Sequence, residues 1–262
     1  MSAASLETRF LAACAIAREA GALQRRRFMN RTAHAYKFKG PQDYLTATDG
    51  EVEALVKKRL ADAFPQDTFV GEEGGGVVSE RTWVVDPIDG TANFARGVPH
   101  FCISIGYVEA GLASIGVIYA PMVDETFAAA RGMGATLNGE PMAVSTIDRM
   151  DQAVIEMGRS ARHPKEIYLE NVGRAMDLGA VVRQGGSGSL AIAHVAAGRS
   201  DAIYEVHMNS WDVLAGLVLV QEAGGRVNDF LANDGVTNGN TVLASTPGIA
   251  GAMSDLFGVP YL

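Results

Sequence analysis

The sequence of 262 residues predicts a mixed α/β fold that forms one compact unit of two packed halves. Two segments near the N-terminus carry apolar residues at every third or fourth position, which is typical of helices. Short apolar runs between residues 68 and 119 have the length of strands, and after about residue 150 strand-like and helix-like segments alternate. We therefore expect an N-terminal α+β half, residues 1–145, and a C-terminal α/β half, residues 146–262.

The first half is expected to begin with two helices. The apolar run from Phe10 to Ala17 is shorter than the roughly 20 residues that span a bilayer, so it indicates a helix face rather than a membrane segment. Thr48 is the expected N-cap of the second helix, which Pro65 ends. The apolar positions of the two helices are Leu6, Phe10, Ala13, Cys14, Ala17 and Gly21, then Val52, Leu55, Val56, Leu60 and Phe64.

Strands and a hairpin are predicted next, followed by the alternating second half. The Asn138-Gly139 pair is a turn signal and predicts a hairpin near the end of the first half. The strands expected before it are Thr68 to Val70, Trp83 to Val85, Ile103 to Val108 and Ser114 to Tyr119. In the second half we expect strands at Ala153 to Glu156, Ala180 to Arg183 and Ala202 to Val206, and helices at Pro164 to Leu178, Ser189 to Ala197 and Trp211 to Ala223.

Composition excludes several classes of protein. The chain is 48% hydrophobic and 20% charged, which is ordinary globular composition, and its formal net charge is -8. Such an acidic chain is not expected to bind nucleic acid or an anionic membrane as its main task. Cys14 and Cys102 lie far apart with no CxxC spacing, so we expect neither a disulfide framework nor a zinc site, and a cytoplasmic location.

The stretch WVVDPIDGTANF, Trp83 to Phe94, carries the strongest chemical signal. An apolar strand ends in Asp86 and Asp89, which lie close together across Pro87 and raise each other's pKa unless a cation neutralises them. Carboxylates and a backbone carbonyl, here that of Ile88, are ligands that Mg²⁺ prefers. Gly90 and Thr91 begin a short helical turn whose free N–H groups favour an anion. The stretch therefore predicts a metal site beside a phosphate site.

Two other segments carry acids that suit the same site. GEEGGG, Gly71 to Gly76, places Glu72 at a strand end on a glycine loop that we expect to be flexible, where the acid is either solvated or a metal ligand. SWDVLAGLVLVQEAGG, Ser210 to Gly225, places Asp212 in the first turn of an apolar helix, where it is either an N-terminal helix charge or a ligand.

With these segments, and with LTATD at Leu45 to Asp49, the sequence resembles the inositol monophosphatase family of Mg²⁺-dependent, lithium-sensitive phosphatases. WVVDPIDGTANF and SWDVLAGLVLVQEAGG match the two signatures of the family, and matching elements run from about Lys39 to Val227. The resemblance implies a layered αβαβα sandwich of the sugar phosphatase type and a homodimer.

The resemblance also implies roles for individual residues. Glu72, Asp86 and the Ile88 carbonyl would hold one Mg²⁺, Asp86, Asp89 and Asp212 a second, and Glu72 with water a weaker third. Asp49 and Thr91 would orient the attacking water, with Glu72 also catalytic. Asp89, Gly90 and Thr91 would contact the phosphate, and Gly186, Ser187 and Glu205 the alcohol.

The substrate stays open at this level. Gly186 and Ser187 belong to a glycine-rich loop that also suits plain helix capping, and Glu205 suits a ring hydroxyl or an amine equally. Inositol 1-phosphate is the first expectation, ahead of other small phosphorylated polyols or amino alcohols: histidinol phosphate, fructose 1,6-bisphosphate and adenosine 3′,5′-bisphosphate. A different class remains as well, a non-catalytic interaction protein of the transcription machinery. We expect His34, His100, His163, His194 and His207 to be structural or surface groups.

Overall fold

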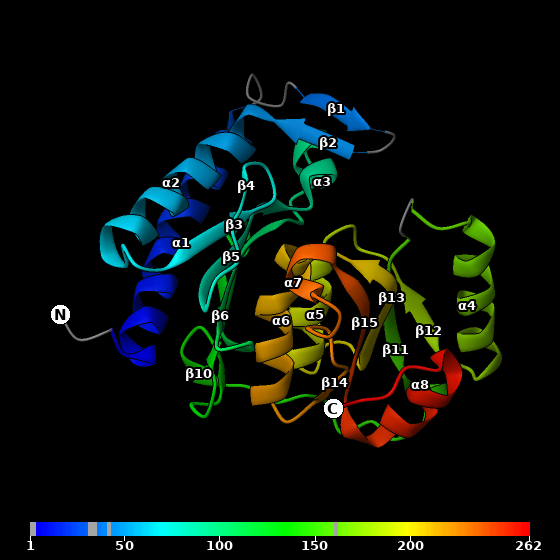
Figure 1. Cartoon of the computed structure of the whole chain (residues 1–262). Helices are drawn as coiled ribbons and strands as arrows, with labels where there is room; N and C mark the ends of the chain where they lie inside the picture. Colours follow the sequence, from blue (N-terminus) through cyan, green and yellow to red (C-terminus); the bar gives the residue numbers. More distant parts are fainter. Residues whose placement is uncertain (1–3, 31–35, 41–42, 160–161) are drawn as a thin grey trace.

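The computed structural model describes residues 4–30, 36–40, 43–159 and 162–262, which form five alternating layers of helix and sheet (Figure 1). An eight-stranded sheet is covered on one face by α1 (Leu6–Met29) and α2 (Ala47–Ala63). Its other face packs on α5 (Gly188–Ala196) and α6 (Ser210–Glu222), which separate it from a five-stranded sheet. The outer face of that second sheet is covered by α4 (Lys165–Asp177) and α8 (Ala250–Phe257). The expected mixed α/β sandwich is confirmed.

The eight-stranded sheet is antiparallel except where β3 and β5 run parallel. Its order is β10-β9-β8-β7-β6-β5-β3-β4. Its strands are β3 (Thr68–Gly71), β4 (Gly75–Gly76), β5 (Arg81–Asp89), β6 (Cys102–Glu109), β7 (Leu112–Ala120), β8 (Glu125–Ala130), β9 (Ala135–Leu137) and β10 (Glu140–Pro141).

The five-stranded sheet is mixed and has the order β12-β11-β13-β15-β14. Its strands are β11 (Val154–Met157), β12 (Val181–Arg183), β13 (Ala202–Met208), β14 (Arg226–Val227) and β15 (Asn240–Ser245). The remaining elements are the hairpin β1 (Tyr36–Gly40) and β2 (Asp43–Thr46), the short helices α3 (Thr91–Arg96) and α7 (Gly235–Asn238), and 3₁₀ turns at Met150–Gln152 and Pro247–Ile249.

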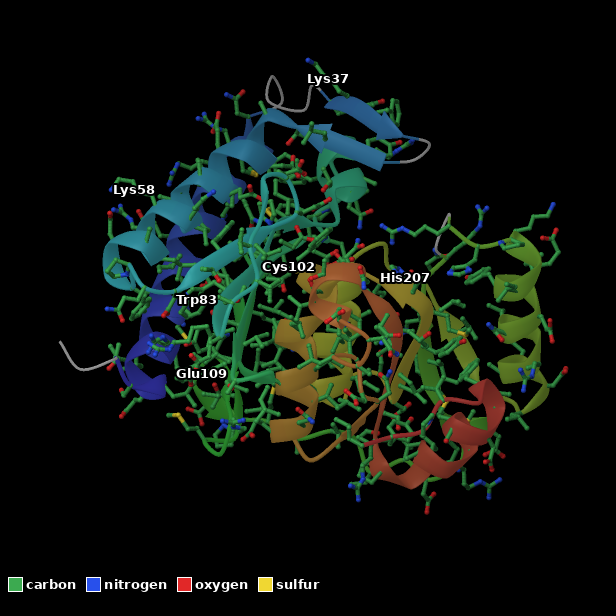
Figure 2. The ribbon with its side chains drawn as sticks, viewed as in Figure 1. Lys37, Lys58, Trp83, Cys102, Glu109 and His207 are labelled. Atoms are coloured by element: carbon green, nitrogen blue, oxygen red, sulfur yellow. The ribbon has the colours of Figure 1, made fainter. Side chains whose placement is uncertain are left out.

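Strand β5 is buried on both faces, which explains its long apolar run. Trp83 and Val85 belong to the core beneath α1 and α2, while Val84 belongs to the core beneath α5 and α6. Figure 2 shows Trp83 on the α1 side of the sheet and Cys102 at the end of the sheet near α6. Because side chains alternate along a strand, Asp86 points to the same side as Val84, toward α6.

Helix α6 lies unusually close to the first sheet. A Cβ built on Gly116 of β7 would lie 2.0 Å from the Ala215 carbonyl oxygen, and one built on Gly106 of β6 would lie 3.1 Å from Leu214 Cβ. At Gly116 only glycine permits this approach of backbone to backbone, and at Gly106 a side chain would crowd Leu214. The contact fixes where the first turn of α6, and therefore Asp212, stands relative to β5.

Most predicted elements are present, with two corrections. Thr46, not Thr48, caps α2: its hydroxyl accepts from the Thr48 N–H, and Asp49 accepts from the Thr46 N–H in a capping box. The expected flexible glycine loop is instead anchored, because Gly75 and Gly76 form β4 and pair with β3. The Asn138-Gly139 hairpin is confirmed, with φ of 53° and 86° at the two residues. Strands β1, β2, β8, β14 and β15 were not predicted.

Helices within the described ranges are all too short or too polar to cross a membrane. Cys14 and Cys102 are both free thiols. The division of the chain into two halves at residue 145 stays a prediction. The core between the two sheets contains side chains from both halves, so the core does not mark a boundary.

Candidate metal centre

Asp86, Asp89 and Asp212 form a compact group of acids at the end of β5. One carboxylate oxygen from each lies within 4.8 Å of the others. Among the described residues, no other group of three or more Asp, Glu, His or Cys side chains lies this close together. A β-bulge creates it: Asp86 pairs with Ser104 and Asp89 with Cys102, so three steps on β5 face two on β6. The extra residue turns both aspartates toward α6.

The neighbouring charges that act most strongly on Asp86 and Asp212 are those of other carboxylates. Burial raises the pKa of Asp86 well above its usual value, and the nearby charges of Glu72, Asp89 and Asp212 raise it further. Burial and the charges of Asp89 and Glu72 likewise raise the pKa of Asp212. Acids in such a place must hold protons or bind a cation. An all-oxygen set with a bulge carbonyl alongside fits Mg²⁺.

Glu72 lies in the turn between β3 and β4, close enough for its charge to act on Asp86 and Asp212. The Glu72 N–H donates to the Val85 carbonyl at 3.2 Å, which ties this turn to β5 just before Asp86. The carboxylate of Glu53, on α2, accepts from the N–H groups of Glu73 and Gly74 at 2.9 and 2.8 Å. Glu53 therefore holds the turn in place, and sequence reasoning missed it because it lies 20 residues from the motif.

Asp49 and Thr91 meet beside the acid cluster, although they are 42 residues apart. Thr91 Oγ1 lies 3.2 Å from Asp49 Oδ1 and 2.8 Å from the Ile88 carbonyl oxygen, so its single proton has two acceptors. Asp49 is fully buried; burial raises its pKa, while hydrogen bonds from Thr46 oppose the rise. The Ile88 carbonyl keeps one lone pair for another ligand.

Gly90 makes the turn from the bulge into α3. Its φ of 97° is in the left-handed region, and a Cβ there would lie 3.0 Å from the His100 carbonyl oxygen. Thr91 is the first helical residue, so the N–H groups of this turn lack intrahelical acceptors and point away from α3. Gly90 and Thr91 thus lie where backbone donors were expected.

Asp89 connects the cluster to the second half of the molecule. It accepts hydrogen bonds from Ser187 Oγ at 2.6 Å, from the Ser189 N–H at 2.6 Å and from the Gly188 N–H at 3.3 Å. These are the first groups of α5, so Asp89 caps that helix from another sheet. Burial raises the pKa of Asp89, and these hydrogen bonds counteract the effect. The Ser187 hydroxyl, expected to face the substrate alcohol, is occupied by Asp89.

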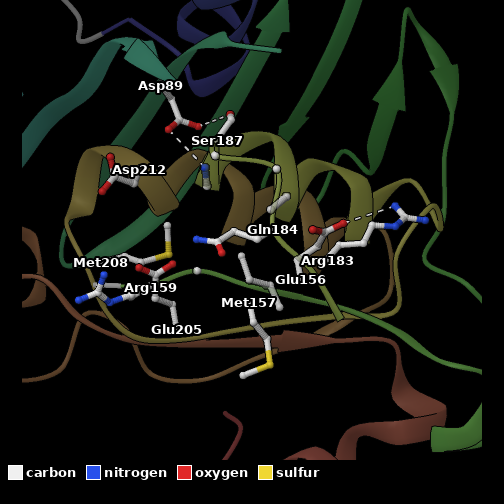
Figure 3. Close-up of a pocket in the computed structure, with 16 residues that line it drawn as sticks. Asp89, Glu156, Met157, Arg159, Arg183, Gln184, Ser187, Glu205, Met208 and Asp212 are labelled. Atoms are coloured by element: carbon white, nitrogen blue, oxygen red, sulfur yellow. Dashed lines mark hydrogen bonds and ion pairs between the residues drawn. The ribbon is translucent and has the colours of Figure 1, made fainter. Parts of the chain in front are cut away.

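A cleft of about 240 Å³ opens beside Asp89 and Asp212. Gly186, Ser187 and Glu205 line it, as do Arg159, Gln184 and Met208 (Figure 3). Figure 3 shows Glu205 and Arg159 across the cleft from Asp89. Burial and the charge of Asp89 raise the pKa of Glu205 to about 7. The structure thus brings predicted site residues from distant parts of the chain together, while Glu72 lies outside the group of three aspartates.

Two further residues shape this region and were not predicted. Asn93 Nδ2 donates to the His100 carbonyl at 2.8 Å and to the Gly185 carbonyl at 3.0 Å, which ties α3 to the glycine-rich loop. Gly158 leaves the space that Glu205 fills, since a Cβ there would lie 1.9 Å from Glu205 Oε2. The four histidines that the structure describes, His100, His163, His194 and His207, lie outside the acid cluster; His34 falls outside the described residues.

Comparison with known proteins identifies relatives along nearly the whole chain. Residues 5–256 match the model of the inositol monophosphatase family. The Nus factor SuhB of Escherichia coli K12 is 36% identical over 242 residues, covering 90% of this chain and 91% of that protein. The extragenic suppressor protein suhB of Bartonella henselae superposes with a TM-score of 0.88 at 32% identity, covering 95% and 98% of the two chains. The inositol monophosphatase of Anabaena gives 0.84 at 32% identity, covering 98% of both.

Proposed function

Because this chain belongs to the inositol monophosphatase family, we propose that it hydrolyses inositol 1-phosphate to inositol and phosphate in a Mg²⁺-dependent reaction. The observation that supports this function most directly is the cluster of Asp86, Asp89 and Asp212, within 4.8 Å of one another at the mouth of a cleft. Such a cluster, next to the first N–H groups of a helix, which lack intrahelical acceptors, suits a phosphate group held by cations.

In the proposed site the chain holds two to three Mg²⁺ ions. Glu72, Asp86 and the Ile88 carbonyl would hold one, and Asp86, Asp89 and Asp212 would hold another. Bound Mg²⁺ supplies positive charge that activates the attacking water and stabilises the departing alkoxide. Lithium sensitivity is expected with the same site.

The protein's own groups position the water and the phosphate. Asp49 is fixed by its capping box and lies 3.2 Å from Thr91 Oγ1. We expect Thr91 to accept a hydrogen bond from the attacking water and to pass a proton to Asp49 Oδ1, which its raised pKa suits. The N–H groups of Gly90 and Thr91 hydrogen-bond the phosphate oxygens. Glu72, in the turn that Glu53 anchors, is expected to be catalytic as well, as a ligand of the metal ions.

The leaving alcohol is expected in the cleft between Gly186 and Glu205. A Glu205 carboxyl with a pKa of about 7 is partly protonated at neutral pH, so it both donates to and accepts from ring hydroxyls. The ammonium group of histidinol phosphate would lower this pKa again and pair with the carboxylate, so Glu205 suits either alcohol and the substrate panel below decides between them. Gly186 and Ser187 line the same cleft.

The proposed function is tested with purified protein and Mg²⁺ on inositol 1-phosphate, histidinol phosphate, fructose 1,6-bisphosphate and adenosine 3′,5′-bisphosphate. We expect the highest kcat/KM for inositol 1-phosphate. The variant Asp89→Asn retains an oxygen that caps α5 but loses the charge, so we expect it to fold and to lose turnover by at least about 10³-fold.

The matched control is Asp177→Asn, which removes one exposed carboxylate at the end of α4. Its turnover should equal that of the wild type. Equal turnover in Asp89→Asn would rule out the proposed site, and preference for another substrate in the panel would reassign the cleft.

A second candidate is a non-catalytic role in transcription, which the name of the E. coli relative, a Nus factor, favours. It predicts that purified RNA polymerase binds the wild type and Asp89→Asn equally well. Turnover by the wild type together with no binding of RNA polymerase would leave the hydrolase as the function. We also expect a cytoplasmic homodimer, to be checked by fractionation and by light scattering.

A further inference from the structure

The end of helix α1 supports the bulge that carries Asp86 and Asp89. Gln24, one of the most buried side chains of α1, has 0% exposure. Its Nε2 donates to the Pro87 carbonyl at 2.6 Å and to the Cys102 carbonyl at 3.2 Å. Pro87 is inside the bulge, and Cys102 is the residue of β6 that pairs with Asp89. One amide group therefore joins the two strands at the point where their register shifts.

The orientation of the Gln24 amide follows from its partners. Both nearby atoms are carbonyl oxygens, so the NH₂ group must face them and the Oε1 atom must point away. No described group donates to Oε1, although it is buried. A leucine or methionine would fill the same space without leaving an unpaired acceptor. The two donors, rather than the packing, are thus what this side chain adds.

The same helix supports the bulge with an apolar contact one turn later. Phe28 packs on Phe94 and Phe101, with ring centroids 5.6 and 4.9 Å apart, in a cluster that also contains Ile88. From the opposite side, Asp86 Oδ1 accepts from the Ile88 N–H at 2.8 Å. The backbone from Asp86 to Asp89 is therefore held by a carboxylate of the acid cluster on one side and by α1 on the other.

We propose that Gln24 is a positioning residue of the metal site: its two hydrogen bonds set the bulge geometry that keeps Asp86, the Ile88 carbonyl and Asp89 at the spacing a cation requires. This inference rests on the proposed function, in which these groups bind Mg²⁺. Groups outside the ligand shell commonly change metal affinity by about 10- to 100-fold. Gln24 acts through the backbone, so we expect a change near the lower end of that range.

The test compares Gln24→Met, which keeps the length of the side chain but has no donor, with the wild type. Mn²⁺ binding to metal-free protein is measured by calorimetry, and the electron paramagnetic resonance spectrum of the bound Mn²⁺ reports the geometry of the site. We expect Gln24→Met to bind Mn²⁺ about tenfold more weakly and to give an altered spectrum. With excess Mg²⁺, the KM for the phosphate ester should stay unchanged.

The control variant is Ile16→Val, a small change at a buried position two turns earlier on α1. It should lower the melting temperature without changing Mn²⁺ affinity or the spectrum, which separates positioning from a loss of stability. If Gln24→Met does not fold, Gln24→Asn, with the donors one methylene short, should fold and weaken Mn²⁺ binding severalfold; unchanged affinity there overturns the inference.

The two proposals fail differently. Unchanged Mn²⁺ affinity in a folded Gln24→Met overturns the role of Gln24 while leaving the metal site intact. Absence of Mn²⁺ binding by the wild type overturns both. Hydrolysis of none of the phosphate esters by a wild type that binds Mn²⁺ overturns the proposed function, and a weaker affinity in Gln24→Met then still supports the positioning role.

Discussion

At the scale of single residues, burial sets the protonation of several groups that a sequence lists only as titratable. His194, on α5, is an example: burial and the charges of Arg199, His100 and Arg183 lower its pKa to about 4, against an opposing effect of Glu125. The expectation that His194 is structural fits this neutral imidazole. Its environment comes from four segments, which no local pattern in the sequence reveals.

His194 gives a pH prediction. Its folded-state pKa lies below the unfolded value of 6.5, so its stabilising contribution is complete above pH 6.5 and is lost as the pH falls toward 4. In the wild type, protonation of His194 should lower the free energy of unfolding by up to about 3 kcal/mol over this window. We expect the variant His194→Gln to lack this loss. Urea unfolding of both proteins from pH 4 to 7 measures it, and parallel pH profiles would contradict the assigned environment.

The signature acids were predictable because their spacing is local: Asp86 and Asp89 belong to one strand end, and Asp212 to one helix start. Their supporting residues were not. Glu53, Asn93 and Gln24 act across 20 to 92 positions of the chain, through contacts that exist only once the layers have packed. The sequence therefore predicts the candidate metal ligands more readily than the residues that hold those ligands in position.

At the scale of elements, buried strands and amphipathic helices were predictable, while weakly apolar strands were not. Strand β8 reads ETFAAA, and alanine is depleted in strands, so its sequence gave no signal. The N-cap of α2 was misplaced by two residues, although Thr46 and Asp49 show the three-residue spacing of a capping box.

Helix α6 gives the prediction at this scale. Gly116→Ala would place a methyl group 2.0 Å from the Ala215 carbonyl, so α6 must move; we expect a loss of about 1–3 kcal/mol and weaker metal binding through Asp212. The control is Gly50→Ala on α2, where a Cβ meets nothing within 4 Å. This variant should raise the free energy of unfolding by roughly 0.5–1 kcal/mol. Chemical denaturation measures both. Equal stability of Gly116→Ala and the wild type would contradict the close packing.

At the scale of the whole molecule, the layers share one continuous core between the sheets. Side chains from β5 to β9 pack there with α5, α6 and strands of the second sheet. The order of the layers was implied by family resemblance, since alternation of elements alone does not decide which helices are central. The division into two halves near residue 145 stays a prediction.

This shared core predicts cooperative unfolding. Trp211 lies on α6, so fluorescence is recorded in Trp211→Phe, where Trp83, buried under α1 and α2, reports the first sheet, while far-ultraviolet circular dichroism reports all helices. We expect both signals to change at the same urea concentration, because neither half buries its inner face alone. Two separate transitions would show that the predicted halves are independent domains.

The late position in the chain of the helices that cover Asp86 and Asp89 has a consequence for synthesis on the ribosome. The first sheet is complete in sequence at Pro141, but α6, which covers its inner face, ends at Glu222. At about 5–20 residues per second, roughly 4–16 seconds pass between these points. During that time the nascent chain presents an apolar sheet face with two unneutralised aspartates at its edge, and those aspartates favour hydration over contact with other chains.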